Sequence, residues 1–303
     1  MKAASYYDAR PLTPCFGIVA ADIDLDRVDL SDQNFVAKLK RDLTDHRAVL
    51  FRGQNLSGQR QVDISAALGT VQSTFYKHPR SPHPDVFRVS NDEEEGCTRV
   101  GRSGWHIDGT FQARPFAYQT MYFPSVAEGG DTYFVPLKEL YDSLGENVRE
   151  EYDRLWMATG RRECPVHPLV YQHPYRKDEE TMLFHCGRPF CSGWYRDESD
   201  DDDDDETAVN GVEVSKMIRP SAIQDQLARQ IESKLDEIGL RMRWQRGDFM
   251  ISDNLGLAHY ASEGTQGRPE SGVGLRILHR TTIVGGGETV PMKADGRRSF
   301  ALR

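Results

Sequence analysis

Between residues 87 and 135 the chain consists of short apolar or aromatic runs that are broken by Gly and Pro, and this stretch constrains the fold most. Runs of this kind, bounded by turn-forming residues, are typical of β-strands. Three later segments, at 240–245, 249–252 and 275–284, continue the pattern. The sequence therefore predicts a core built mainly from β-strands.

Two helices are predicted in the N-terminal part of the chain, with a short buried strand between them. Residues 31–46 repeat apolar side chains at every fourth position behind Ser31, which is a suitable N-cap. Residues 57–68 form the second helix, which is closed by Gly69. The apolar run 48–51 is the strand that lies between them.

The clearest helical pattern lies at residues 221–238, where Ser221 and Gln224 have the spacing of a capping box. One face of this helix carries an apolar stripe formed by Ile223, Leu227, Ile231, Leu235 and Ile238. Shorter helical stretches are expected around 140–141 and 148–152. Together with the strands, these helices predict an α+β chain that is rich in β-structure.

The length of 303 residues suffices for one large domain or two ordinary ones. Because no repeat and no dividing linker is visible, we expect a single domain over residues 1–303. The segment 197–206 is acidic apart from Ser199, and such a block repels itself and resists burial. We expect this segment to be a disordered, solvated insert without a catalytic role.

The composition argues against several kinds of partner. No apolar run approaches the roughly 18 residues that cross a bilayer, and the N-terminus lacks the apolar region of a signal peptide. The net charge of -9 opposes binding to phosphate backbones. Five cysteines without a Cys-x-x-Cys pair argue against a disulfide framework and a zinc ribbon. We expect a cytoplasmic protein, monomeric or homo-oligomeric, that binds neither membranes nor nucleic acid.

His106, Asp108 and His259 are the candidate metal ligands. Side chains at i and i+2 of a strand point to the same face, so His106 and Asp108 can bind one ion from a strand end. Two imidazoles and one carboxylate are the ligand set of non-haem Fe(II) oxygenases. The alternatives are a chance His-x-Asp pair at the surface and a His259 that is merely hydrogen-bonded in the core.

Four other histidines are predicted to be structural. His167 and His173 stand in a Pro-rich stretch, where loop packing accounts for them. His46 and His185 have no partner pattern in the sequence. None of the four is therefore expected in the metal site.

Residues 274–283 read as a strand with two arginines on one face. By alternation Arg276 and Arg280 share this face with Leu278, and they lie about 13 Å apart. A buried arginine needs a partner, because an unpaired charge is very costly there, and its guanidinium suits carboxylates or sulfonates. An edge strand with solvent-exposed arginines is the alternative.

Four motifs occur in the same order as in a known family. They are Trp105-His106-x-Asp108, Gly129-Gly130-Asp131-Thr132, Asp253-Asn254-x-x-x-x-His259 and Arg276-Ile277-Leu278-His279-Arg280. With this order and spacing the chain resembles, over nearly its whole length, the taurine dioxygenase (TauD/TfdA) family of Fe(II)/2-oxoglutarate-dependent oxygenases. The resemblance implies a double-stranded β-helix, a cupin-like jelly-roll core with buttressing helices.

The resemblance also implies roles by position. The three candidate ligands would bind iron as the catalytic centre, with 2-oxoglutarate and O2 as cosubstrates. Arg276 would pair with the distal carboxylate of 2-oxoglutarate, assisted by the hydroxyl of Thr132. His78 and Arg280 match positions that hold the anionic group of the substrate.

The activity implied is hydrogen abstraction from an aliphatic carbon of a small anionic substrate, such as a sulfonate, an amino acid or a carboxylate. The expected outcome is hydroxylation, with succinate and CO2 as coproducts. One alternative is desaturation or oxidative cyclisation of an amino-acid-derived dicarboxylate, as in kainoid synthases. An alternative of another class is a non-catalytic jelly-roll binding or sensor protein, which would usually lose a ligand or the cosubstrate arginine.

Departures from the family pattern surround the expected substrate end of the site. Ser252-Asp253-Asn254-Leu255 stands where the family commonly has Trp-Asp-Asn-Arg, and the loop 262–272 is longer than in taurine dioxygenase. These differences argue against taurine itself as the substrate. Basic residues expected near the mouth, which would also suit a dianionic substrate, are Lys77, Arg102, Arg114 and Arg280.

Overall fold

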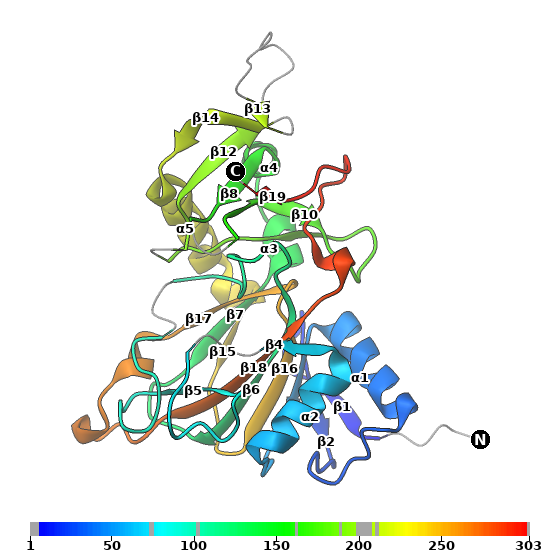
Figure 1. The fold of residues 1–303 in the computed structure, drawn as a ribbon, viewed down its shortest axis with the longest axis vertical. Helices are drawn as coiled ribbons and strands as arrows, with labels where there is room; N and C mark the ends of the chain where they lie inside the picture. The colour runs from blue at the N-terminus through cyan, green and yellow to red at the C-terminus, as the bar shows by residue number, and fades with distance from the viewer. Residues whose placement is uncertain are drawn as a thin grey trace.

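The structure is a computed structural model in which two large β-sheets lie at opposite ends of the long axis (Figure 1). It describes residues 6–72, 76–100, 104–160, 163–187, 190–197, 208–209 and 212–301. An eight-stranded sheet occupies the lower half of the view, and a six-stranded sheet lies at the top. The architecture is mixed α and β and rich in strands, as the sequence predicts. In the described part of the chain, no helix is long and apolar enough to span a membrane.

The eight-stranded sheet has the order β1-β2-β3-β16-β6-β18-β4, and β5 pairs with β18 on the same edge as β4. The strands are β1 (Asp8–Pro11), β2 (Ile18–Ala21), β3 (Ala48–Phe51), β4 (Thr70–Gln72), β5 (Phe87–Ser90), β6 (Phe116–Ser125), β16 (Asp248–Asp253) and β18 (Ile277–Val284). Only β2 and β3 pair in parallel. The predicted buried strand at 48–51 is confirmed, since all four of its residues are buried.

Helices α1 (Gln33–His46) and α2 (Gly58–Leu68) contact this sheet, α1 at β3 and β16, and α2 at β18 (Figure 1). For α2 the predicted closure is confirmed, because Gly69 is the C-cap and donates its amide to the carbonyl of Ser65, while Ser57 caps the other end. For α1 the predicted cap is wrong. Asp32 caps the helix, while the Ser31 hydroxyl donates to Asp29 instead.

A three-stranded sheet of β15 (Leu240–Met242), β7 (Thr132–Pro136) and β17 (Leu257–Ala261) lies next to helix α5 (Pro220–Ile238) in sequence and in space. The predicted apolar stripe of α5 is confirmed, since all five of its members are buried. The predicted capping box is wrong, because Arg219 is the N-cap and no side chain caps the helix. Gln224 donates instead to the carbonyl of His185 at 2.9 Å.

The six-stranded sheet was not predicted, because its pairing joins short segments that are far apart in the sequence. It contains β13 (Ala208–Val209), β14 (Val212–Ile218), β12 (Gly193–Asp197), β8 (Leu155–Ala158), β9 (Pro165–Pro168) and β19 (Phe300–Ala301). Strands β10 (Val170–Gln172) and β11 (Glu180–Met182) form a separate pair. The predicted short helical stretches are confirmed as α3 (Leu137–Asp142) and α4 (Glu146–Asp153).

Asp197, the first residue of the predicted acidic insert, is buried at the end of β12, which corrects the prediction for this residue. Its carboxylate accepts hydrogen bonds from Trp156 Nε1 and Lys293 Nζ, both at 2.6 Å. Arg297 binds both carboxylate oxygens, at 2.6 and 2.9 Å. Three partners satisfy the buried charge that a solvated tract would expose to water. Residues 198–206 lie outside the described residues.

Candidate metal centre

The ligand atoms of His106, Asp108 and His259 all lie within 4.8 Å of one another. Nε2 of His106 is 4.0 Å from Oδ1 of Asp108, and Nε2 of His259 is 3.7 Å from Oδ2. The histidines are 5% and 4% exposed, so water reaches their rings little. The structure thus brings the three predicted ligands together in one buried cluster.

Backbone pairing between His106 and His259 joins two distant parts of the chain. Each residue donates its amide to the carbonyl of the other, at 3.1 and 2.9 Å, and the ring centroids are 4.3 Å apart. His259 lies in β17, whereas His106 forms only isolated bridges and the chain turns at Asp108. The predicted strand through the His-x-Asp segment is therefore wrong. The segment from His106 to Asp108 is held in place by this bridge and by the turn at Gly109, whose φ is +85°.

Asn254 fixes the backbone of Asp108 from the turn between β16 and β17. Its Oδ1 accepts from the Asp108 amide at 2.8 Å, and its Nδ2 donates to the Asp108 carbonyl at 2.9 Å. The same Nδ2 donates to the carbonyl of Phe116 at 2.8 Å. Asn254 therefore fixes the main chain of a candidate ligand through two hydrogen bonds.

The neighbouring Asp253 organises this turn. Its Oδ1 accepts from the amides of Leu255 and Gly256, and its Oδ2 lies 2.8 Å from Nε2 of His173. The side chains of His173 and Asp253 are 0% and 2% exposed, so this is a fully buried pair. His173 is structural, as predicted, but it acts on the turn that carries Asn254.

The protonation states in the cluster suit a divalent cation. Burial lowers the pKa of His259 to about 3, and burial likewise lowers the pKa of His106, so both rings are neutral near pH 7. Burial alone would raise the pKa of Asp108, but the charge and the hydrogen bond of Arg280 outweigh it, and the pKa lies below its usual range. Neutral imidazoles and an ionised carboxylate are the states that metal coordination requires. The donor set therefore fits Fe(II).

Arg276 is a buried cation just before β18. It is 3% exposed, its Nε donates to the carbonyl of Gly130 at 3.2 Å, and its guanidinium carbon lies 5.1 Å from the ring centre of Phe123. No carboxylate among the described residues forms an ion pair with it. Burial lowers the pKa of Arg276 to about 10, which still leaves it charged at neutral pH. The predicted buried arginine is present, and it lacks the partner that such a charge needs.

Thr132 belongs to the same cluster of side chains as Arg276. Trp244 donates its Nε1 to the hydroxyl of Thr132 at 2.9 Å and stacks on Phe123 with ring centres 4.1 Å apart. Phe123 is the ring that lies beneath Arg276. In β7, Thr132 stands opposite Ala261 of β17, two positions beyond His259. The sequence analysis found Thr132 but missed Trp244, which orients its hydroxyl.

Arg280 contacts the cluster directly. Its Nη1 donates to Oδ2 of Asp108 at 2.7 Å, and its guanidinium carbon lies 5.2 Å from the ring centre of Phe87. Its Nε is buried without a hydrogen-bond partner in the described part of the chain. Arg276 and Arg280 lie over rings of one apolar cluster, so the predicted shared face is confirmed.

His78 contacts none of the three candidate ligands in the described structure. Its Nε2 lies 3.1 Å from the carbonyl of Glu93, and its Nδ1 accepts from the Arg80 amide at 3.2 Å. Lys77 is exposed, and Arg102 lies outside the described residues. The structure therefore does not bring His78 to the triad.

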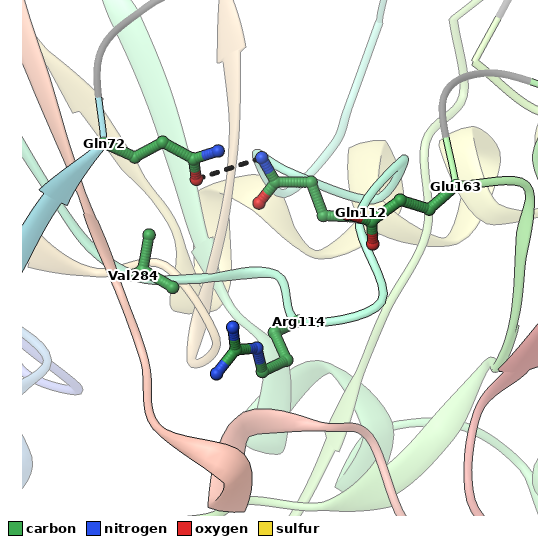
Figure 2. A pocket seen from close by; sticks show the side chains of 5 residues that line it. All are labelled: Gln72, Gln112, Arg114, Glu163 and Val284. Carbon is green, nitrogen blue, oxygen red and sulfur yellow. Dashed lines mark hydrogen bonds between the residues drawn. The ribbon is translucent and has the colours of Figure 1, made fainter.

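Arg114 lines a separate small pocket instead of the metal cluster. Figure 2 shows its guanidinium beside Val284, with a hydrogen bond of 3.0 Å from Gln112 to Gln72 across the pocket. The volume is about 140 Å³, and Glu163 is the fifth lining residue. None of the three candidate ligands lines this pocket. The prediction that Arg114 lies at the mouth of the metal site gains no support from this placement.

Two further polar residues touch the candidate ligands: Gln119, which the sequence did not reveal, and His185, which was predicted to be structural. The ring of His185 stacks on His106 with centroids 4.5 Å apart and an interplanar angle of 16°. Nε2 of Gln119, in β6, lies 3.4 Å from Nδ1 of His259. Gln119 and Thr120 interrupt the otherwise apolar run 116–123, and that interruption was the available signal. His185 carries no comparable signal in the sequence.

Comparisons with known proteins agree with this geometry. The family model described as "Taurine catabolism dioxygenase TauD, TfdA family" matches residues 8–282. The alpha-ketoglutarate-dependent sulfate ester dioxygenase of Pseudomonas putida is 28% identical over 284 residues, which cover 90% of this chain and 87% of that protein. The alpha-ketoglutarate-dependent 2,4-dichlorophenoxyacetate dioxygenase of Cupriavidus pinatubonensis is 28% identical over 163 residues, covering 48% of this chain and 56% of that protein.

Solved structures share the fold. A taurine dioxygenase from Burkholderia xenovorans superposes with a TM-score of 0.73 at 24% identity, covering 99% of this chain and 97% of that one. A β-rich fold that gathers two imidazoles and one carboxylate is the arrangement of a non-haem metal-dependent oxygenase. The chain belongs to the TauD/TfdA family of dioxygenases, because the family model spans nearly its whole length. The resemblance seen in the sequence is confirmed.

Proposed function

We propose that this enzyme abstracts hydrogen from an aliphatic carbon of a small organic anion and that hydroxylation is the outcome. The enzyme is a dioxygenase that uses Fe(II), 2-oxoglutarate and O2. When bound, the iron and 2-oxoglutarate supply the oxidising chemistry, and the cosubstrate leaves as succinate and CO2. The observation that carries the proposal is a buried cluster of three side chains that could hold a metal ion, together with a buried arginine that has no anionic partner in the part of the chain that the structure describes.

In this proposal His106, Asp108 and His259 hold the iron. Their ligand atoms face one another across distances that one cation can close, and both rings present Nε2 to the carboxylate. Asn254 holds the Asp108 main chain in place, so the carboxylate starts from a fixed position. The three side chains leave the remaining coordination positions to cosubstrate and O2, as in other sites of this ligand type.

Arg276 is assigned to the distal carboxylate of 2-oxoglutarate. The guanidinium is buried and unpaired among the described residues, and a bidentate carboxylate is the ligand that best satisfies such a group. Thr132 supplies a second hydrogen bond, because its hydroxyl accepts from Trp244 and is therefore free to donate its own proton. Both groups lie around Phe123, so they can reach one anion together.

The substrate end is assigned to Arg280, with His78 as a further candidate. Sulfate esters and 2,4-dichlorophenoxyacetate, which the relatives' names give as their substrates, each carry one anionic group on an organic body. The unpartnered Nε of Arg280 provides a buried donor next to Asp108, and such an anion could accept from it. His78 would have to exchange its bonds to Glu93 and Arg80 to take part.

We further propose that the fold is a double-stranded β-helix. His259 stands on the three-stranded sheet, Arg280 stands on β18 of the eight-stranded sheet, and Asn254 lies in the turn that joins β16 to β17, so the metal cluster lies where these two sheets meet. This arrangement supports a double-stranded β-helix with α1 and α2 as buttressing helices. We also propose that residues 1–303 form one domain, that the protein acts in the cytoplasm, and that it binds no nucleic acid.

The decisive experiment is the anaerobic addition of Fe(II) and 2-oxoglutarate to the purified protein. We expect a visible metal-to-ligand charge-transfer band, because 2-oxoglutarate chelates an iron that the triad holds. Asp108→Ala is expected to abolish the band, whereas Asp24→Ala, an exposed carboxylate, leaves it unchanged. Absence of the band in folded wild-type protein would contradict the proposed site.

The reaction outcome is tested separately by a succinate-release screen over sulfate esters, sulfonates, aryloxy acids and amino dicarboxylates. Hydroxylation adds one oxygen to the mass of the product or of the fragments it releases. A loss of two hydrogens would instead support the alternative, desaturation or oxidative cyclisation. Folded, iron-loaded protein that releases no succinate with any substrate would favour a binding or sensor role.

A further inference from the structure

A buried glutamine lies against the ring of His259 on the side away from Asp108. Gln119 is 1% exposed, and its Nε2 lies 3.4 Å from Nδ1 of His259. Its Oε1 is buried and has no hydrogen-bond partner in the described part of the chain. An amide with one end against a candidate ligand and the other end unsatisfied requires an explanation.

The tautomer of His259 provides that explanation. Nε2 of His259 faces Asp108 at 3.7 Å and is the atom that a metal would bind. A neutral imidazole has one protonated and one bare nitrogen, so a metal at Nε2 requires the proton to be on Nδ1. An amide N–H that points at Nδ1 requires the opposite tautomer. With the amide in this orientation, the glutamine works against metal binding.

Exchanging the two ends of the amide removes the conflict. The oxygen and nitrogen of a glutamine side chain are nearly the same size, and the hydrogen-bond network decides which is which. After the exchange, Oε1 accepts the Nδ1–H of His259, and Nε2 takes the position of the present unpartnered oxygen. The number of unsatisfied side-chain atoms on Gln119 stays the same, so the tautomer of the ligand decides between the two orientations.

His106 has the same kind of contact from a main-chain group. Its Nδ1 lies 2.7 Å from the carbonyl of Gly104, which can only accept a hydrogen bond. The proton of His106 is therefore on Nδ1, and Nε2 is bare toward Asp108. His259 lies in a regular strand, where its neighbours' carbonyls are paired within the sheet. A side chain from another strand has to supply the acceptor, and Gln119 is the one in contact.

We propose that Gln119 is a positioning residue that accepts the Nδ1–H of His259 and thereby holds this histidine in the tautomer that binds metal. The inference rests on the proposed role of His259 as an iron ligand. Acceptors behind metal-bound histidines typically contribute about 10–100-fold to metal affinity. Gln119 is expected to act through His259 alone.

The first test is long-range 1H–15N correlation NMR of the metal-free protein, which reports which ring nitrogen of His259 carries the proton. The wild type is expected to show the Nδ1–H form. Gln119→Leu removes the acceptor and is expected to shift His259 toward the Nε2–H form that free histidine prefers. A wild-type His259 protonated on Nε2 would overturn the proposal without any reference to catalysis.

The second test is Co(II) binding followed by its d–d absorption. Gln119→Leu is expected to weaken Co(II) binding about 10–100-fold, and Gln119→Glu, which keeps an acceptor at the same place, is expected to restore most of it. Gln61→Leu is the matched control, because Gln61 is fully buried and bonded to Thr120 and the His279 carbonyl, away from the ligands. It should lower Tm without changing Co(II) affinity.

The outcomes of these tests distinguish the role of Gln119 from the existence of the metal site. Equal Co(II) affinity of Gln119→Leu and Gln61→Leu would overturn the role of Gln119 and leave the metal site standing. Failure of the wild type to bind Co(II), while the NMR shows Nδ1–H, would overturn the proposed metal site and leave the hydrogen bond. If Gln119→Leu does not fold, the wild-type tautomer and the affinity of Gln119→Glu still decide the question.

Discussion

At the residue scale, Arg276 and Arg280 are expected to have separate effects when each is changed to alanine. Arg276 is buried and has no anionic partner among the described residues, so Arg276→Ala should raise KM for 2-oxoglutarate by about 100-fold, equivalent to roughly 2.7 kcal/mol for a lost charge-assisted pair. Arg280 bonds Asp108 and is proposed to bind the anionic group of the substrate, so Arg280→Ala should raise mainly the substrate KM. Steady-state kinetics with each cosubstrate varied in turn measures both. Equal effects of the two changes on both constants would refute this partition.

A glycine beside Arg276 supports a second prediction at this scale. A Cβ on Gly130 would lie 2.9 Å from Cδ of Arg276, so the side chain reaches its place only because residue 130 has none. Gly130→Ala should displace the guanidinium at a cost of about 1–3 kcal/mol. The expected result is a smaller rise in Tm on adding 2-oxoglutarate with Mn(II). Gly145→Ala is the control, since nothing lies within 4 Å of the added methyl group.

These residues differ in how far the sequence could reveal them. The triad, Arg276 and Thr132 stand in motifs whose order carries information; the structure gathers the triad in one cluster and places Arg276 and Thr132 around Phe123. Gln119 and Trp244 act through single contacts that depend on which strands become neighbours. Gln119 lies on β6 of the eight-stranded sheet and His259 on β17 of the three-stranded sheet, so their contact depends on how the two sheets pack, which no local pattern in the sequence encodes.

At the element scale, the turn between β16 and β17 depends on the buried pair of His173 and Asp253. Removing one member of such a pair leaves an uncompensated group, so Asp253→Asn should lower the free energy of unfolding by about 3–5 kcal/mol. Urea unfolding of the metal-free protein at neutral pH measures this. The control is Asp24→Asn, whose ion pair with Arg27 is exposed and should contribute less than about 1 kcal/mol.

The pair of His173 and Asp253 also makes the free energy of unfolding depend on pH. Burial would raise the pKa of Asp253, but the charge and hydrogen bond of His173 outweigh it, and the folded-state pKa lies below its ordinary value. A lowered carboxyl pKa stabilises the fold above the unfolded value of about 3.9, and that contribution is lost as pH falls through the lower folded value. The difference in free energy of unfolding between wild type and Asp253→Asn should therefore have its full size at pH 6 and be smaller at pH 3. A gap that widens on acidification would contradict this account.

Elements were predictable where one segment contains its own signal. Helix α5 was found because five apolar side chains recur on one face, and β3 because four consecutive residues are apolar. The caps of α1 and α5 were misassigned because nearby side chains compete for the same donors and acceptors. Strands such as β8 and β9 are four residues long, and only pairing across the sheet defines them.

At the scale of the whole molecule, Asp197 ties the C-terminal segment to the six-stranded sheet. Its carboxylate bonds Trp156 in β8 and Lys293 and Arg297 near the C-terminus, and Lys293 is only 7% exposed. Asp197→Ala leaves a buried cation unpaired and should cost about 3–5 kcal/mol. The control is Asp295→Ala, an exposed partner of the same Arg297.

This change also tests whether residues 1–303 unfold as one domain. The six-stranded sheet lies at the far end of the molecule from α1 and α2 (Figure 1), and none of the three candidate ligands belongs to it. If the chain is one cooperative unit, Asp197→Ala should shift the urea midpoint equally for far-UV circular dichroism and for loss of bound Co(II). Two domains would instead give a biphasic dichroism curve in which the Co(II) transition keeps its wild-type midpoint. Because Asp197 contacts none of the candidate ligands, a common shift can arise only through coupled unfolding of the two regions.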